Sequence, residues 1–167
     1  MAPEDIPSVL KIANTVHPDL PEDASIFAER LELFPEGCLV LVSPPSSSSP
    51  EQICGYAISH PILKHHPPAL NSLLGEIHPQ ADQYYIHDVA VLPSFRDRGL
   101  ARRCVDRLLA VATGYGFPDT CLVSVYGAAR FWARFGFAVK GDRKKDEALG
   151  EKLKGYGGDA EFMERRN

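Results

Sequence analysis

The 167-residue sequence has no long apolar run and no closely paired cysteines. No stretch approaches the roughly 20 apolar residues that a membrane span needs, so we expect no membrane association. The N-terminal segment is too acidic, and its apolar part too short, for a signal peptide. The cysteines are scattered without a C-x-x-C pair, at Cys38, Cys54, Cys104 and Cys121. This spacing argues against a zinc site or a dense disulfide framework and predicts reduced cysteines in a cytoplasmic protein.

An excess of either charge is also lacking. The formal net charge is -4, and 44% of the residues are hydrophobic. This composition predicts one globular domain over residues 1–167 and no nucleic-acid partner. Four histidines lie in or beside a long loop without helix-spaced partners or suitably spaced acidic residues: His60, His65, His66 and His78. We therefore predict no metal site.

Hydrophobic periodicity predicts a mixed set of elements. Helical spacing is found in residues 3–16, 24–34, 100–116 and 128–135. Short apolar runs predict strands at 38–43, 52–60, 83–92, 120–126, 137–141 and 160–166. Residues 44–51 are a polar hairpin tip, and the long loop 61–83 carries Leu70, Leu73 and Leu74 at the spacing of one helical turn. The order α-α-β-β-β-α-β-α-β-β indicates a mixed α/β or α+β fold.

The stretch "LPSFRDRG" connects a predicted strand to the start of the best predicted helix. Free backbone N–H groups and the positive end of the helix dipole make such a start an anion site. Gly99 permits a positive φ and close approach of the backbone, and neighbouring arginines add charge. The stretch has neither a P-loop nor a G-x-G-x-x-G pattern. On these residues alone, a solvated turn remains the alternative to a phosphate site.

Two motifs resemble those of the GNAT superfamily of N-acetyltransferases. "DVAVLPSFRDRGLA" is similar to its acetyl-CoA motif, here Arg96-x-x-Gly99-x-Ala101, and "ARFWARFGF" is similar to its A-x-x-F-Y-x-x-x-G-F motif. The close match covers residues 84–137. "YYIHDVAV" and "RFWARFGF" look most like the arylalkylamine N-acetyltransferase branch.

The resemblance implies a twisted mixed sheet, flanked by helices and splayed between the strands near 84–92 and 120–126. The pantetheine arm of acetyl-CoA would pair with the first of these strands, and the pyrophosphate would rest on the amides of residues 98–102. The cofactor-binding residues so implied are Val89, Ala90, Val91, Arg96, Asp97, Arg98, Gly99, Leu100, Ala101, Arg102, Phe131 and Trp132. The family's first strand is missing or very short here. One sheet edge is then bare or covered by a second chain, which leaves a homodimer open.

Acetyl transfer needs a neutral amine, although a free alkylamine has a pKa of about 10. His87, on the strand that the family uses for catalytic histidines, is the predicted base, and a structural sheet histidine is the alternative. By alternation, Tyr85, His87 and Val89 share a face unless a bulge intervenes. Asp88 is a partner of His87, a substrate carboxylate or a cap. The Val89 N–H is the predicted oxyanion donor.

The family position for the general acid holds Trp132, and an indole cannot give a proton to a thiolate. Trp132 is therefore interpreted as a pocket wall or as core. Tyr126 or Tyr85 could supply the proton instead, or the thiol, with a pKa near 8.5, could leave as a thiolate. The acceptor site is predicted between residues 14–18 and the loop 61–83, with walls at Ile62, Leu63 and Leu70.

The sequence thus predicts an acetyl-CoA-dependent N-acetyltransferase that acts on a small primary amine, such as an arylalkylamine or a polyamine. The first alternative is an acetyltransferase for protein lysines or peptide N-termini. The second, suggested by Trp132, is an acyl-CoA-binding domain without catalysis.

Overall fold

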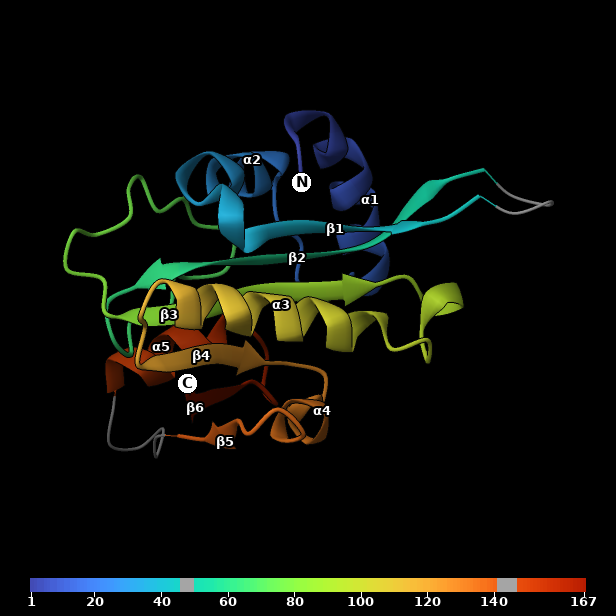
Figure 1. Ribbon diagram of the computed structural model, residues 1–167. Coiled ribbons are helices and arrows are strands. Elements are labelled where there is room, and N and C mark those ends of the chain that lie inside the picture. Colours follow the sequence, from blue (N-terminus) through green and yellow to red (C-terminus); the bar gives the residue numbers. More distant parts are fainter. Residues whose placement is uncertain (46–49, 141–146) are drawn as a thin grey trace.

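A computed structural model gives the fold and describes residues 1–45, 50–140 and 147–167 (Figure 1). The α-helices are α1 (Ile6–Val16), α2 (Ala24–Leu33), α3 (Leu100–Gly114), α4 (Ala129–Ala133) and α5 (Glu147–Lys154). The strands are β1 (Cys38–Ser43), β2 (Gln52–Ile62), β3 (Gln83–Val91), β4 (Asp119–Ser124), β5 (Ala138–Val139) and β6 (Glu161–Arg166). The predicted mixed α/β class is confirmed.

Two local predictions differ from the structure. Helix α5 was not predicted, because half of its residues are charged and Gly150 interrupts its few apolar residues. The helical turn expected at Leu70, Leu73 and Leu74 is wrong, because these residues form a turn and irregular backbone. Asn71 takes a left-handed conformation there, with φ of 53°, which a helical turn cannot contain. The predicted hairpin tip lies mainly in 46–49, outside the described residues.

The strands form one sheet in the order β1-β2-β3-β4-β6-β5. Antiparallel pairing joins β1 to β2 and β2 to β3, whereas β3 and β4 are parallel. The parallel pairing stops after Ile86 and Leu122. Beyond this point, β3 is paired only with β2 among the described residues. The predicted splay between β3 and β4 is therefore present. At the outer edge of the sheet, β1 follows both N-terminal helices in the chain.

A β-bulge interrupts β3 at His87. On β2, the consecutive residues Ile58 and Ser59 pair with Asp88 and Ile86, so His87 is the extra residue. Tyr85 and His87 stay on one face, with ring centroids 5.9 Å apart. Val89 instead packs against the cluster beneath α3, on the opposite face. The expectation that Val89 shares a face with His87 is thus wrong, because the bulge shifts the alternation.

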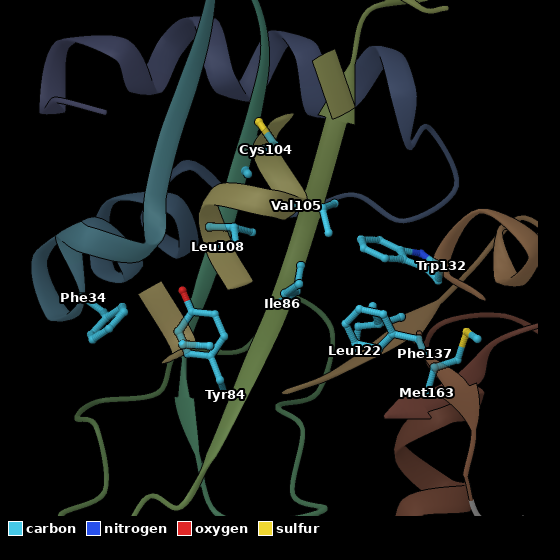
Figure 2. Close-up of a cluster of buried hydrophobic side chains, with 12 residues drawn as sticks. Phe34, Tyr84, Ile86, Cys104, Val105, Leu108, Leu122, Trp132, Phe137 and Met163 are labelled. Carbon is cyan, nitrogen blue, oxygen red and sulfur yellow. The ribbon is translucent and has the colours of Figure 1, made fainter. Parts of the chain in front are cut away.

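Helices cover both faces of the sheet (Figure 1). On one face, α3 packs on β3 through a buried cluster that includes Ile86, Val105, Leu108, Leu122 and Trp132 (Figure 2). On the other face, α1 and α2 cover β2, and α5 covers β4 and β6. The cluster under α3 closes one side of the splay, so the space between β3 and β4 has rigid walls. No helix in the described ranges has the length and apolar character of a membrane span.

Candidate active site

A cavity of about 800 Å³ lies where β3 and β4 separate. It extends from the start of α3 to the segment between α1 and α2. Its walls come from β3, β4, α4 and the loops at either end: Val16, His17, Leu20, Glu22, Leu70, Ile86, His87, Asp88, Val89, Val91, Phe95, Arg96, Asp97, Gly99, Leu100, Ala101, Arg102, Leu122, Val123, Val125, Tyr126, Ala128, Phe131, Trp132, Arg134 and Tyr156. One space therefore joins the predicted phosphate site to the predicted base.

The start of α3 has the geometry of an anion site. Gly99 is the residue before the helix, with φ of 72°, and a Cβ built there would meet nothing within 4 Å. Asp97 is also left-handed, with φ of 60°. No described side chain caps this helix. The N–H groups of the first turn consequently remain free to bind a ligand in the cavity.

The arginines around this turn have different surroundings. Arg96 and Arg102 line the cavity, and Arg134 from the end of α4, which was not among the predicted residues, joins them. Arg98 does not line it. Its guanidinium donates to the Ser94 carbonyl oxygen at 3.1 Å and lies 5.1 Å from the Phe95 ring. We attribute the different surroundings of Arg98 to the left-handed turn at residue 97, which directs the Arg98 side chain away from the cavity.

The strand and the short helix supply the middle of the cavity. Val89 and Val91 line it from β3, and Phe131 and Trp132 from α4. Ala90 points to the opposite side of the sheet and packs under α1, so only its backbone faces the splay. Trp132 is 8% exposed and lies in the core as well as in the cavity wall. Trp132 is therefore both a wall of the pocket and part of the core.

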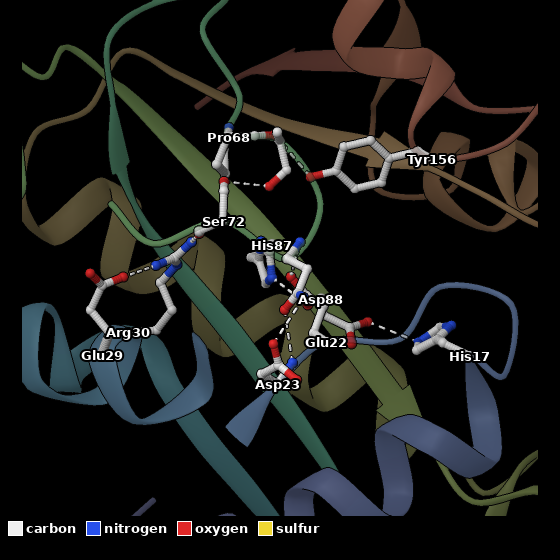
Figure 3. A network of polar contacts seen from close by, with 12 residues as sticks. His17, Glu22, Asp23, Glu29, Arg30, Pro68, Ser72, His87, Asp88 and Tyr156 are labelled. Atoms are coloured by element: carbon white, nitrogen blue, oxygen red, sulfur yellow. Dashed lines mark hydrogen bonds and ion pairs between the residues drawn. The ribbon is translucent and has the colours of Figure 1, made fainter. Parts of the chain in front are cut away.

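His87 is paired with Glu22, which lies between α1 and α2 (Figure 3). The His87 Nε2 and Glu22 Oε2 atoms are 2.9 Å apart, and the two side chains are 2% and 8% exposed. Burial alone would raise the pKa of Glu22, but the charge and hydrogen bond of His87 outweigh burial and lower it. An ionised Glu22 accepts from Nε2–H, which leaves the lone pair of His87 on Nδ1. Nδ1 is buried and has no partner among the described residues.

A second histidine–carboxylate pair lies beside the first. His17 Nε2 is 3.0 Å from Asp88 Oδ1, and the Tyr56 hydroxyl donates to Asp88 Oδ2. Burial disfavours the charged forms of both His17 and Asp88, but each charged side chain stabilises the charged form of the other. The pKa of His17 is accordingly raised and that of Asp88 lowered. Because Asp88 is bound by both His17 and Tyr56, we assign this pair to structure and to the charge of the pocket.

Sequence reasoning assigned no individual role to three of these residues. Glu22 and Tyr56 were not singled out, and His17 appeared only within a predicted wall. Pairs such as Glu22 and His87, 65 positions apart, become visible only when the helices are placed on the sheet. No pattern in the sequence marks the bulge that turns both His87 and Asp88 toward α1 and α2.

The two candidate acids have opposite surroundings. Tyr126 follows β4, lines the cavity and stacks on His17, with ring centroids 5.7 Å apart. Desolvation, and then the charge of Asp19, raise the pKa of Tyr126, so it keeps its proton at neutral pH. Tyr85 is fully buried in the cluster beneath α5 and does not line the cavity. The structure therefore brings Tyr126, and not Tyr85, to the site.

Of the predicted acceptor walls, the structure brings some to the cavity. Val16 and His17 represent the segment 14–18, and Leu70 represents the long loop. Ile62 and Leu63 do not line the cavity, because β2 extends to Ile62, which packs beneath α5. Across the described part of the chain, no cluster of three or more histidine, cysteine or acidic residues could hold a metal ion.

The pair of His17 and Asp88 predicts a measurable pH dependence of stability. Because folding raises the pKa of His17, this residue contributes to the stability of the fold. The contribution is complete below the ordinary pKa of 6.5 and is lost as pH rises through the raised value. The lowered pKa of Asp88 stabilises above 3.8 and is lost as pH falls through the lowered value. We expect His17→Gln to lower Tm by about 3 °C between these limits and by less at higher pH. Thermal melts against His66→Gln, an exposed loop histidine, check this; an equal loss at all pH values would contradict it.

Comparison with known proteins agrees with this geometry. The sequence matches the acetyltransferase (GNAT) family over residues 7–137. No curated protein matches it. Rv2747 from Mycobacterium tuberculosis, solved in complex with CoA and NLQ, is 18% identical, with a TM-score of 0.68 over 99% of this chain and 96% of its own.

Two further solved structures share the fold. The loading GNATL domain of CurA from Lyngbya majuscula is 13% identical, with a TM-score of 0.76 over 99% of this chain and 94% of its own. The NatC complex bound to Gag peptide and CoA is 18% identical, with a TM-score of 0.68 over 98% of this chain and 91% of the matched chain. The family match covers most of the chain and includes both predicted motifs. The chain therefore belongs to the acetyltransferase (GNAT) family.

Proposed function

We propose that the protein is an acetyl-CoA-dependent N-acetyltransferase for a small primary amine, with motifs that resemble those of the arylalkylamine branch. The observation that carries this proposal is the single cavity with an anion site at one end and the His87–Glu22 pair at the other. Four free and buried cysteines are compatible with the reducing cytoplasm that we propose as its compartment.

The residues at the start of α3 fit acetyl-CoA. The free amides of the first turn would hold the pyrophosphate, with Arg96 and Arg102 beside them. The open splay leaves β3 backbone for the pantetheine arm. When bound there, acetyl-CoA supplies an acetyl group activated as a thioester. The wall formed by Phe131 and Trp132 would exclude water from this part of the cavity.

The charges of the opposite end favour an amine. Its carboxylates are Glu22 and Asp88, and the arginines that line the cavity belong to α3, its preceding turn and α4. The remaining walls are apolar or aromatic: Val16, Leu20, Leu70, Val125, Tyr126 and Tyr156. A cationic amine on an apolar or aromatic body is complementary to this surface.

In the proposed transfer, His87 removes the proton that the ammonium form of the acceptor carries, and Glu22 stabilises the resulting imidazolium. The acceptor nitrogen then forms the C–N bond to the acetyl carbon, and the Val89 N–H is proposed to stabilise the oxyanion of the resulting tetrahedral intermediate. When the thioester C–S bond breaks, Tyr126 gives its proton to the departing sulfur. The second proton that the nitrogen loses on becoming an amide restores the Tyr126 hydroxyl, and His87 releases its proton to solvent, so the products are the N-acetyl amine and the CoA thiol.

We expect Tyr126→Phe to lower kcat about tenfold. This effect is modest for a general acid because a thiol with a pKa near 8.5 can also leave as a thiolate. The acetyl-CoA KM should stay unchanged, because Tyr126 lies away from the start of α3. Steady-state kinetics at several pH values measure both parameters. A kcat equal to that of the wild type would remove Tyr126 from the mechanism.

The proposal is tested by thiol release from acetyl-CoA with a panel of acceptors, with mass spectrometry of the product. The panel contains phenethylamine, an indole ethylamine, spermidine, amino acids and a lysine peptide. We expect the highest kcat/KM with the aromatic amines. Turnover of the peptide alone would support the alternative of a protein acetyltransferase, which the likeness to the peptide-bound NatC complex suggests. Binding of acetyl-CoA without turnover of any acceptor would indicate a non-catalytic domain.

A further inference from the structure

The loop between β2 and β3 is bound to the start of α2 by the side chain of Asn71. Its Oδ1 accepts from the backbone N–H of Asp23 at 2.8 Å, and its Nδ2 donates to Asp23 Oδ2 at 3.0 Å. The Asn71 backbone N–H donates to Glu22 Oε1 at 3.1 Å. Asn71 adopts φ of 53°, a conformation that asparagine tolerates better than most residues. One exposed residue thus makes three hydrogen bonds to the neighbouring segment.

Two residues of α2 extend this attachment along the loop (Figure 3). The Arg30 guanidinium, fully buried, donates to the Ser72 carbonyl oxygen at 2.7 Å. The Glu29 carboxylate accepts from the backbone N–H groups of Leu74 and Gly75, at 2.9 and 2.8 Å. These charge-assisted bonds are made to the loop backbone and do not involve the loop side chains.

The other end of the same loop segment is held from the C-terminal side. Lys152 Nζ donates to the Pro67 carbonyl oxygen at 2.9 Å, and the Tyr156 hydroxyl donates to that of Pro68 at 3.0 Å. Between the two attachments, Leu70 lines the cavity. Residues 67–75 therefore form a roof that crosses the acceptor end from α5 to α2.

Glu22 links this roof to the proposed base. One carboxylate oxygen accepts from Asn71 of the roof, and the other faces His87 Nε2. A roof that moved away from α2 would therefore also release one of the two bonds that orient Glu22.

We infer that Asn71 determines acceptor size by fixing residues 67–75 over the acceptor end, so that the pocket admits a small amine and excludes a polypeptide. Asn71 acts as a specificity-determining and positioning residue, because it touches Glu22 and Asp23 and lies outside the cavity lining. This inference rests on the proposed function.

The test compares Asn71→Gly with Leu73→Ala. Glycine accepts the left-handed conformation and keeps the backbone bond to Glu22, so only the side-chain bonds to Asp23 are lost. Leu73 lies in the same loop and is 60% exposed, so its truncation is a matched control. We expect Asn71→Gly to reduce the ratio of kcat/KM for phenethylamine to that for a lysine hexapeptide about tenfold, as the loss of two hydrogen bonds predicts. The KM for acetyl-CoA should be unchanged.

Hydrogen exchange supplies a readout that needs no acceptor. The amides of Leu74 and Gly75 should exchange faster in Asn71→Gly than in the wild type or Leu73→Ala. A wild type that acetylates no acceptor of the panel overturns the proposed function, and with it the inference. A wild type that prefers the peptide overturns the assignment of a small amine as acceptor together with the inference. With a wild type that prefers the small amine, the inference alone is overturned if Asn71→Gly keeps the wild-type selectivity or the wild-type exchange.

Discussion

Gly99→Glu is expected to weaken acetyl-CoA binding by roughly 100-fold, because a carboxylate at the start of α3 would lie where the pyrophosphate is proposed to bind. The open space around Gly99 means that the new side chain meets no protein atom near its Cβ. Its main effect on the protein is backbone strain of about 1–2 kcal/mol at a φ of 72°. Calorimetric titration with acetyl-CoA measures the loss directly.

The other end of α3 provides the control. Gly116 also has a positive φ, of 78°, and open space at its Cβ. Gly116→Glu therefore introduces the same side chain and similar strain, far from the cavity lining. It should lower Tm by a similar amount and leave acetyl-CoA affinity at the wild-type value. Equal affinities for the two variants would show that the pyrophosphate does not bind at the start of α3.

His87→Ala is expected to reduce kcat with the preferred amine by about 100- to 1,000-fold, the range typical of a lost general base. Acetyl-CoA affinity should be unchanged, because His87 lies at the opposite end of the cavity from Gly99. The pH profile separates a base from a structural histidine. Without a base, the rate should follow the fraction of neutral amine and rise about tenfold per pH unit below the amine pKa.

His60 gives a matched control for His87. Its ring centroid lies 6.0 Å from that of His87, and it is buried without lining the cavity. His60→Gln therefore disturbs the same region of the sheet without removing the proposed base, so its pH profile should keep the wild-type shape. If both variants lost activity equally, with parallel pH profiles, His87 would have a structural role.

The geometry of the proposed phosphate site could be predicted from the sequence because it is local. A strand, a turn with Gly99 and a helix follow each other in the chain, and the backbone N–H groups of a helix start are present whatever the side chains are. The exception is Arg98, whose side chain turns back to Ser94 and Phe95. Its direction depends on the left-handed Asp97, and no spacing rule indicates a positive φ at an aspartate.

The acceptor end could not be predicted in the same way. Glu22 meets His87, and Tyr56 meets Asp88, only after α1, α2 and β2 are packed around β3. The roof of the pocket depends equally on contacts between distant segments, such as Asn71 with Asp23. Alternation along β3 correctly placed Tyr85 with His87 but failed at Val89, because the bulge adds one residue to one strand.

The bulge also ties the chemistry of β3 to a single inserted residue. Without residue 87, Ile86 and Asp88 would be consecutive, and the ladder with β2 would continue in regular register. In a regular ladder, only every second side chain of β3 would face α1 and α2. In the bulged strand, the consecutive residues His87 and Asp88 both face these helices. No substitution can restore that ladder, but the loss of one codon can. The most regular version of this sheet is thus one without the proposed base, and the irregularity is the part of the strand that places His87 beside Glu22.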